Sequence, residues 1–140
     1  MNYVIHPLRG VDQIEFGMTP QQTRSRMKGD FELFKRTPQV SFPSEYFPEE
    51  HAFFYYDVSG LLQAIEFAPP AQPTIGGLDL FGLTFGQAVT KLRLLDNSLE
   101  EDADGAIARR LGVSIWAPLA KDDRNAPVES VLVFRKGYYD

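Results

Sequence analysis

The sequence contains no cysteine, and this absence excludes disulfide bonds, thiolate metal ligands and a cysteine nucleophile. Its only two histidines, His6 and His51, have no metal-ligand spacing and stand beside no candidate nucleophile. The sequence also lacks a Gly-x-Ser-x-Gly elbow, a P-loop and a dinucleotide-binding fingerprint. These absences argue against an enzyme, and we expect no cofactor and no bound metal.

Long apolar segments are also missing. No run approaches the roughly 18 residues that a membrane-spanning helix needs, and the first residues, "MNYVIHPLRG", lack the basic, apolar and small-residue pattern of a secretory signal. We therefore expect a cytoplasmic protein without a membrane partner.

Basic residues are absent from the middle of the chain. Residues 37–90 contain no lysine or arginine but six acidic residues, whereas the whole chain carries a formal charge of -5. Nucleic acid is a poor candidate ligand for such a chain, because phosphate binding requires clustered basic side chains. A basic protein would instead be steered towards this acidic segment.

The composition is that of a packed globule. Of 140 residues, 44% are hydrophobic and 13% aromatic. A chain of this length can bury a sizeable core as one unit. We expect a single domain over residues 1–140.

A short motif occurs twice. "FGMTPQQTRSRM" begins at Phe16 and "FGLTFGQAVTKL" at Phe81. Each contains a Thr-x-x-Gln capping box, in which the threonine and glutamine side chains satisfy the free backbone donors of a helix start. The motif therefore predicts two helices, the first extending towards Gly29, where a glycine can end it.

Strand-like segments follow each predicted helix. A turn at residues 57–60 joins two apolar runs of a hairpin, and "LGVSIWAP" and "VESVLVFRKGYY" follow the second helix. We predict an α+β fold of two helix-plus-antiparallel-strand units, 1–68 and 78–137, around one curved antiparallel sheet. The proline-rich residues 69–77 would connect the units. Duplication and shared local physics explain the repeat equally well.

An acidic stretch, "EEDADG", begins with the rhythm of a calcium-binding loop. Its twelfth position is Leu111, where such a loop needs a bidentate glutamate, so a solvated loop is favoured. The segment "VSFPSEYFPEEHAFFYYD" mixes large aromatic residues with acids, a composition that suits either a protein-binding surface or a core strand.

Several stretches resemble small bacterial immunity proteins encoded beside polymorphic or contact-dependent growth-inhibition toxins. They are "VDQIEFGMTPQQTRSRM", "GLDLFGLTFGQAVTKL", "LGVSIWAP" and "VESVLVFRKGYYD", and together they cover most of the chain. The helix start followed by strands is also similar, more distantly, to a unit of an outer-membrane assembly lipoprotein and of the β-lactamase inhibitory protein. This chain has neither the lipidation cysteine of the first nor the disulfides of the second.

The resemblance implies a non-enzymatic protein that binds and blocks a cognate toxin domain, often a nuclease with a basic groove. It names no contact residues, so charge alone suggests them, and oligomeric state is left open. An uncharged epitope with Tyr46 or Tyr138 is an alternative. The acidic candidates for toxin binding are Glu45, Glu49, Glu50, Asp57, Asp96, Glu100, Glu101, Asp102 and Asp104.

Two further functions fit the sequence. A small-molecule or peptide-binding module would place Phe53, Tyr55, Phe67 and Trp116 around one aromatic pocket. An enzyme would instead require carboxylates such as those of Asp57 and Glu66 to meet in a cleft with raised pKa values.

Overall fold

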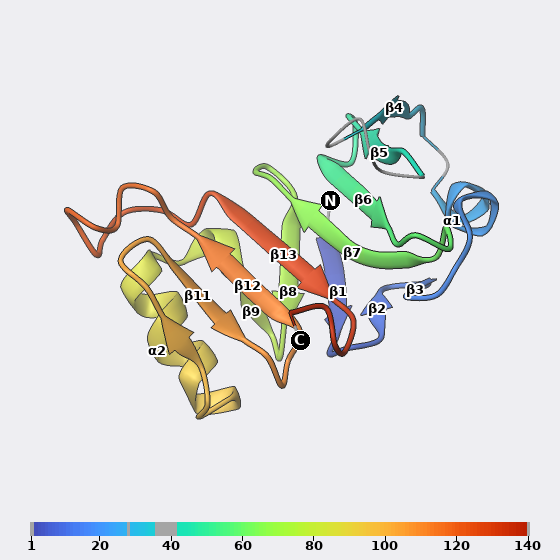
Figure 1. Ribbon diagram of the computed structural model, residues 1–140. Helices are drawn as coiled ribbons and strands as arrows, with labels where there is room; N and C mark the ends of the chain where they lie inside the picture. Colours follow the sequence, from blue (N-terminus) through green and yellow to red (C-terminus); the bar gives the residue numbers. More distant parts are fainter. Residues whose placement is uncertain (1, 28, 36–41, 140) are drawn as a thin grey trace.

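The fold is mixed α and β, with strands as its main component. The structure is a computed structural model that describes residues 2–27, 29–35 and 42–139. In this part of the chain the strands form two sheets, and two α-helices accompany them (Figure 1). The expected combination of helices and antiparallel strands is therefore confirmed, although the chain is richer in strands than an even α+β mixture. The expectation of one antiparallel sheet is wrong, because the strands form two sheets and one of these contains a parallel pair.

The larger sheet has eight strands in the order β10-β11-β12-β13-β7-β6-β5-β4, and every neighbouring pair is antiparallel. It joins two four-stranded meanders, β4–β7 and β10–β13, through the pair β7 and β13. The strands are β4 (Glu32–Phe34), β5 (Ser44–Phe47), β6 (Ala52–Tyr56), β7 (Leu62–Phe67), β10 (Glu100–Glu101), β11 (Gly105–Ala108), β12 (Val113–Trp116) and β13 (Ser130–Phe134).

The smaller sheet has the order β3-β2-β1-β8-β9. Its central strands, β1 and β8, are parallel, and the other pairs are antiparallel. This sheet brings the start of the chain beside the segment that follows the first meander. The strands are β1 (Asn2–His6), β2 (Gly10–Val11), β3 (Ile14–Glu15), β8 (Gln72–Ile75) and β9 (Leu78–Asp79).

Strand β8 lies inside the proline-rich residues 69–77, which the sequence indicated as a connector. On one side of β8, Pro73 pairs with Tyr3 of β1. On the other side β9 pairs only with Thr74 and Ile75, so no strand lies beside Pro73 there, and proline is tolerated. At such an edge position a missing N–H removes no ladder bond. The segment thus connects the meanders and also takes part in a sheet.

Both predicted helix starts are confirmed. Helix α1 (Pro20–Arg26) and helix α2 (Phe85–Leu95) each begin with a complete capping box formed by the expected threonine and glutamine. A short 3-10 helix, η1 (Leu80–Gly82), precedes α2. Helix α1 ends at Arg26, short of Gly29, because Met27 already adopts an extended conformation.

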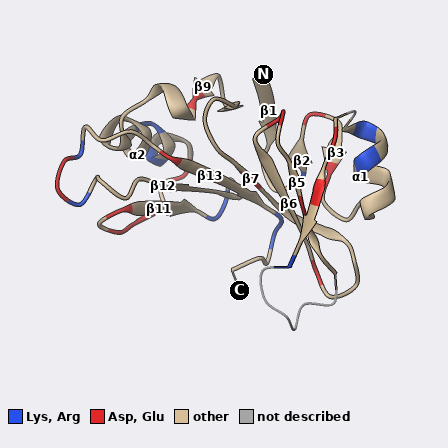
Figure 2. Cartoon of the chain, turned by 90° about the horizontal axis from the view of Figure 1, so that it is seen from above, with Lys and Arg blue, Asp and Glu red and all other residues tan. Residues whose placement is uncertain are grey.

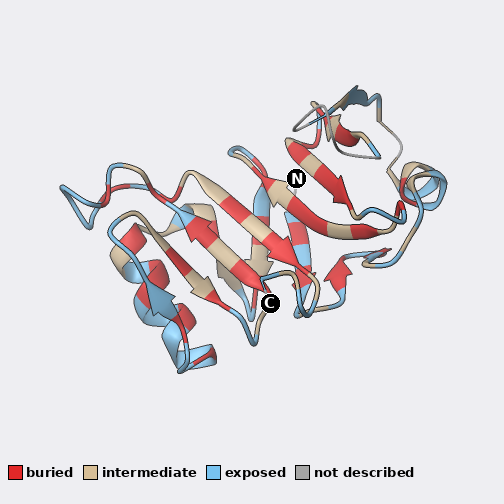
Figure 3. Ribbon diagram, in the orientation of Figure 1, coloured by how far each residue is buried: buried red, intermediate tan, exposed pale blue. Residues whose placement is uncertain are grey.

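The main core lies on one face of the large sheet, which we call the inner face. A row of buried side chains crosses five strands there: Phe54, Ile65, Val133, Val113 and Ala108. The small sheet and α2 cover this face, and Figures 1 and 2 show both on the same side of the large sheet. Buried and partly exposed residues alternate along the central strands (Figure 3), as expected for strands with two unlike faces.

A buried polar network attaches α1 to the sheet. Arg24 forms an ion pair with Glu45 of β5, whose other carboxylate oxygen accepts a hydrogen bond from the Tyr56 hydroxyl. Thr23, the one buried residue of α1, contacts the same hydroxyl. Burial raises the pKa of Tyr56, and the bond to Glu45 raises it further, so this tyrosine remains a donor. A helix with so small an apolar face is thus held mainly by charge-assisted hydrogen bonds.

The helix caps give a stability test. Thr84 Oγ1 accepts from Gln87 N at 3.2 Å, and Thr84 N donates to Gln87 Oε1 at 3.0 Å. Replacing Thr84 by alanine removes the acceptor and should lower the free energy of unfolding by about 1 kcal/mol, as measured by urea denaturation. Thr84→Ser keeps the hydroxyl and serves as the control. Equal stability of the wild type and Thr84→Ala would contradict the cap's contribution.

Candidate functional site

The opposite, outer face of the large sheet is covered by no helix in the described part of the chain. Backbone pairing places a row of side chains across it: Tyr46, Phe53, Glu66, Leu132, Ser114 and Ile107. A small apolar cluster around Tyr55, Ala64 and Phe134 lies beside this row on the same face. Figure 2 shows the end of the described chain on this side of the sheet, opposite α2. The outer face is therefore partly apolar, and the residues of this row are half-exposed.

A shallow hollow lies at the middle of the outer face. It has a volume of about 200 Å³. Glu66 of β7 lies in it and accepts hydrogen bonds from the Tyr55 and Ser130 hydroxyls, both at 2.6 Å. Trp116, with 49% of its surface exposed, and Tyr138 form part of its wall. The hollow thus combines one fixed carboxylate with two amphipathic aromatic side chains.

The alternation of β12 and β13 builds this hollow. Val113 and Ile115 point into the core, so Ser114 and Trp116 between and beyond them point outward. Trp116 is paired with Ser130 at the start of β13. The pairing of β13 with β7 then brings the Ser130 hydroxyl within hydrogen-bond distance of Glu66. The serines are small enough to leave the space that larger outward side chains would fill.

The C-terminal segment supplies the last part of the wall. Tyr138 stacks on Phe134 with ring centroids 5.7 Å apart, and Tyr139 meets both rings edge-on. The Arg109 guanidinium lies 5.5 Å above the Tyr139 ring. These contacts fix Tyr138 at the border of the hollow.

The hollow suits a positively charged group. A carboxylate has about four lone-pair sites, and the Tyr55 and Ser130 hydroxyls use two of those of Glu66. The remaining sites can accept from an ammonium or guanidinium group, and the face of Trp116 offers an additional cation–π contact.

Besides Glu45, which pairs with Arg24, three of the predicted acidic contact residues form ion pairs within the chain. Asp57 pairs with Arg135 at 2.9 Å, and Glu100 with Arg109 at 3.4 Å. Glu101 bridges two arginines, Arg93 at 3.3 Å and Arg124 at 2.6 Å. Their charges are therefore largely compensated.

The pKa of Asp57 lies below its ordinary value. Burial acts to raise it, but backbone donors at Leu61 and Ser59 and the Arg135 ion pair outweigh that effect. Asp57 thus stabilises the turn between β6 and β7 and stays ionised. The enzyme interpretation required Asp57 and Glu66 to meet in one cleft with raised pKa values. Asp57 is not among the residues that line the hollow of Glu66, and the pKa of Asp57 is lowered.

Asp96 is also a structural residue. Only 2% of its surface is exposed, and it accepts hydrogen bonds from the backbone N–H groups of Ser98 and Arg110 and from the Ser98 hydroxyl. Burial acts to raise its pKa, but these donors hold the pKa below the ordinary value. Asp96 therefore ties the end of α2 to the turn after β11.

The remaining predicted contacts are spread over the molecule. Glu45 is fully buried beneath α1, so it offers no surface to a partner in this structure. Glu50 is buried on the inner side of the sheet. Glu49 and Asp102 are exposed, and Asp104 is half-buried. The nine acidic residues do not form one patch.

The four rings proposed for an aromatic pocket do not share a cavity. Tyr55 and Trp116 line the outer hollow, whereas Phe67 lies on the inner face and lines a different cavity. Phe53 lies on the outer face and stacks on Tyr46 with ring centroids 4.4 Å apart. Alternation along β6 and β7 separates the rings, because successive residues point to opposite faces.

Sequence reasoning missed the combination of Glu66 with Ser114 and Ser130. The hydrogen bond between Glu66 and Ser130 joins residues 64 positions apart, and only the pairing of β7 with β13 brings them together. A polar residue inside the apolar run "IEF" was the available signal, because alternation puts it on the face opposite its neighbours.

Comparisons with protein-family models, with curated proteins and with solved structures give no match for this chain. No helix among the described residues is long and apolar enough to cross a membrane. In the same residues no three histidine, aspartate or glutamate side chains are grouped as metal ligands. The site must therefore be interpreted from its own geometry.

The lowered carboxyl pKa values predict an acid-sensitive stability. A folded-state pKa below the unfolded value of about 3.8 for Asp96 gives a stabilisation that is complete above that pH and is lost as the pH falls through the folded pKa. Asp57 and Glu101 act in the same direction. The free energy of unfolding should thus be flat near neutral pH and fall in acid.

Asp96→Asn tests this assignment by urea denaturation across the same pH range. The variant should be less stable than the wild type at neutral pH and should lose less stability in acid. Asn97→Ala, at the exposed neighbouring position, should leave the acid-side slope unchanged. An unaltered slope in Asp96→Asn would contradict the role of this carboxylate.

Proposed function

We propose that the chain is an immunity protein that binds a cognate bacterial toxin domain, a nuclease being the favoured class, and neutralises it by forming a stoichiometric complex. The observation that carries this proposal is the open outer face with the Glu66 hollow at its centre. Such a protein needs no catalytic group, cofactor or metal. The four stretches that resemble immunity proteins support the same conclusion.

The composition of the outer face suits a protein interface. Tryptophan and tyrosine are enriched among the residues that dominate binding energies, and such anchors gather near the centre of an interface. Trp116, Tyr138, Tyr46 and Phe53 all lie on or border this face and remain partly exposed. A partner covering them would bury apolar area and exclude water from the hollow.

Charge specifies the kind of partner. Glu66 would receive a lysine or arginine side chain from the basic substrate groove of the toxin, with its charge shielded from water by Trp116. The exposed acids of the β10–β11 edge, Asp102 with the half-buried Asp104, would add longer-range attraction. Of the acids first suggested by charge, Glu49, Asp102 and Asp104 remain the best candidates for peripheral contacts.

We also propose that the chain consists of two related units within a single domain. In each half a short hairpin is followed by a capped helix and a four-stranded antiparallel meander. The last strands of the meanders, β7 and β13, pair antiparallel, which is the arrangement that an approximate two-fold axis would generate. On this interpretation the outer hollow lies close to the axis, where the halves meet.

The proposal requires a toxin gene beside the gene of this chain, and co-expression with the toxin domain encoded there tests the function. We expect restored growth of cells that make the toxin, and a one-to-one complex of the two purified proteins. Unprotected cells together with no complex would contradict the proposal.

Variants test which face is used. Trp116→Ala should weaken the complex by about 2 kcal/mol or more if this ring is a central anchor, as measured by isothermal titration calorimetry. Glu66→Gln should lower affinity and reduce its salt dependence. Leu94→Ala is the matched control, because Leu94 is 82% exposed on α2, away from the outer face. Equal losses in the Trp116 and Leu94 variants would contradict recognition through the outer face.

A further inference from the structure

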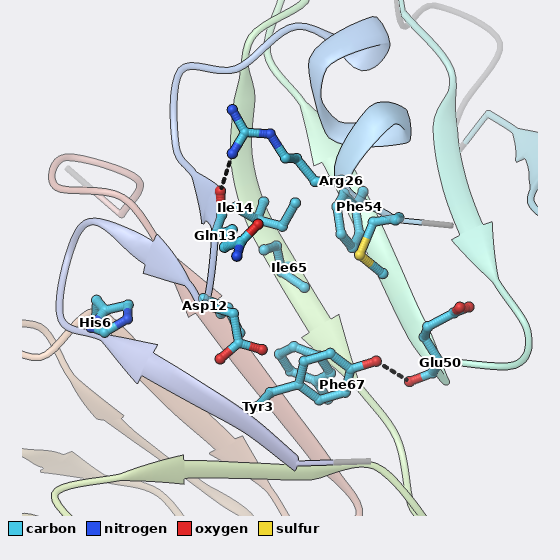
Figure 4. Close-up of a pocket in the computed structure, with 12 residues that line it drawn as sticks. Tyr3, His6, Asp12, Gln13, Ile14, Arg26, Glu50, Phe54, Ile65 and Phe67 are labelled. Atoms are coloured by element: carbon cyan, nitrogen blue, oxygen red, sulfur yellow. Dashed lines mark hydrogen bonds between the residues drawn. The ribbon is translucent and has the colours of Figure 1, made fainter. Parts of the chain in front are cut away.

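A larger cavity lies on the other side of the sheet. It has a volume of about 620 Å³ and is bordered by the small sheet, the end of α1 and the inner face of the large sheet. Its walls include the rings of Tyr3, Phe54 and Phe67, as seen in Figure 4. Polar residues, His6, Asp12, Gln13 and Arg26, are exposed at its border. The cavity therefore has an apolar interior and a polar entrance.

Glu50 is the exceptional residue of this cavity. Glu50 is one of the residues that line the cavity, and only 7% of it is exposed. Its Oε2 atom is buried and has no hydrogen-bond partner among the described residues. Leaving a buried charged oxygen without a partner is costly, and native proteins normally satisfy such groups.

Three other inward carboxylates among the described residues are compensated, whereas Asp79 Oδ1, like Glu50 Oε2, is buried without a partner there. Glu45 has Arg24, Asp57 has Arg135, and Asp96 has three donors. The chain thus usually supplies arginine or N–H donors to its inward carboxylates. Glu50 differs from these three carboxylates, and it borders a space that can hold a small ligand.

The surroundings of Tyr3 also show a negative local field. Its hydroxyl donates to the backbone oxygen of Glu50 at 3.4 Å. Burial raises the pKa of Tyr3 well above its usual range, and the charges of Glu50 and Asp12 raise it further. Figure 4 shows these two carboxylates on opposite sides of the Tyr3 and Phe67 rings.

We propose that this cavity binds a small organic ammonium ion, with its N–H donors on the Glu50 carboxylate and its apolar part against Phe54 and Phe67. A cation compensates a buried carboxylate better than a neutral donor, and aromatic walls attract cations. A bare metal ion fits less well, because hard cations need several oxygen ligands and no three ligand side chains are grouped among the described residues.

Gly29 fixes the position of the recognising group. A Cβ atom added at Gly29 would lie 2.4 Å from Glu50 Oε1. The absence of a side chain there lets the carboxylate approach the backbone closely. Gly29→Ala should therefore push the end of the Glu50 side chain aside without changing any charge.

Benzylammonium is a suitable probe, and benzyl alcohol is its neutral analogue of similar shape. In amide NMR titrations of the full chain, millimolar benzylammonium should shift the signals of Tyr3, Phe54 and Phe67, and benzyl alcohol should bind more weakly. Glu50→Gln should weaken benzylammonium binding at least about tenfold. Glu49→Gln is the matched control, since this exposed neighbour is outside the cavity, and it should bind as the wild type does.

Three results would overturn the inference: equal affinity for the ammonium ion and the alcohol, unchanged binding in Glu50→Gln, or no amide shifts with either benzylammonium or the shorter propylammonium. Thermal melting first establishes that the variants are folded. If Glu50→Gln does not fold, Gly29→Ala replaces it, and wild-type affinity in that variant would count against Glu50 as the recognising group. Because the cavity lies on the inner side, the outcome is independent of the toxin-binding test.

Discussion

The antiparallel pairing of β7 with β13 is the contact on which the rest of the structure depends. It sets Ile65 opposite Val133 on the inner face and Glu66 opposite Leu132 on the outer face. A slip of one residue would exchange the faces, burying the glutamate and exposing the aliphatic residues. The same register that closes the core therefore also fixes the carboxylate of the outer hollow, and neither can change without the other.

The acidic excess of residues 37–90 is partly compensated in the folded chain by arginines from other segments. Residues 37–90 have no basic residue of their own, yet Glu45 and Asp57 find Arg24 and Arg135 from the flanking segments. Folding thus converts a local charge imbalance into long-range ion pairs that attach α1 and the last segment to the large sheet. The charge that remains available for recognition is smaller and is located at fewer positions than composition indicates.

Features with local causes could be predicted from the sequence. The two capping boxes and the turn at residues 57–60 depend on side chains within four positions of one another, so their sequences contain the necessary information. The alternation of apolar and polar residues in "LGVSIWAP" is likewise local, and it agrees with the inward positions of Val113 and Ile115 in β12. Strand β8 was missed because its partner, β1, is about 70 residues away, and proline content argued against a strand.

The candidate site could not be predicted for the same reason, because its contacts join residues that are far apart in the sequence. Charge alone put Glu45 and Asp96 on the surface, but both side chains have close partners that remove them from it. Glu66 owes its position to Ser130 and Tyr55 on neighbouring strands. Such groupings follow from strand register, which one short segment does not determine.

The two proposed sites occupy opposite faces of one strand. On β7, Ile65 and Phe67 line the inner cavity, while Glu66 between them lies in the outer hollow. This strand has a neighbour on each side, β6 and β13, so its backbone is held more firmly than the two-residue edge strand β10 or the turns that carry the exposed acids. Recognition that requires a fixed geometry is best built on such an element. A central carboxylate held by two hydroxyls is therefore a stronger basis for specificity than a larger number of acids on the edge, whose contribution is attraction at a distance.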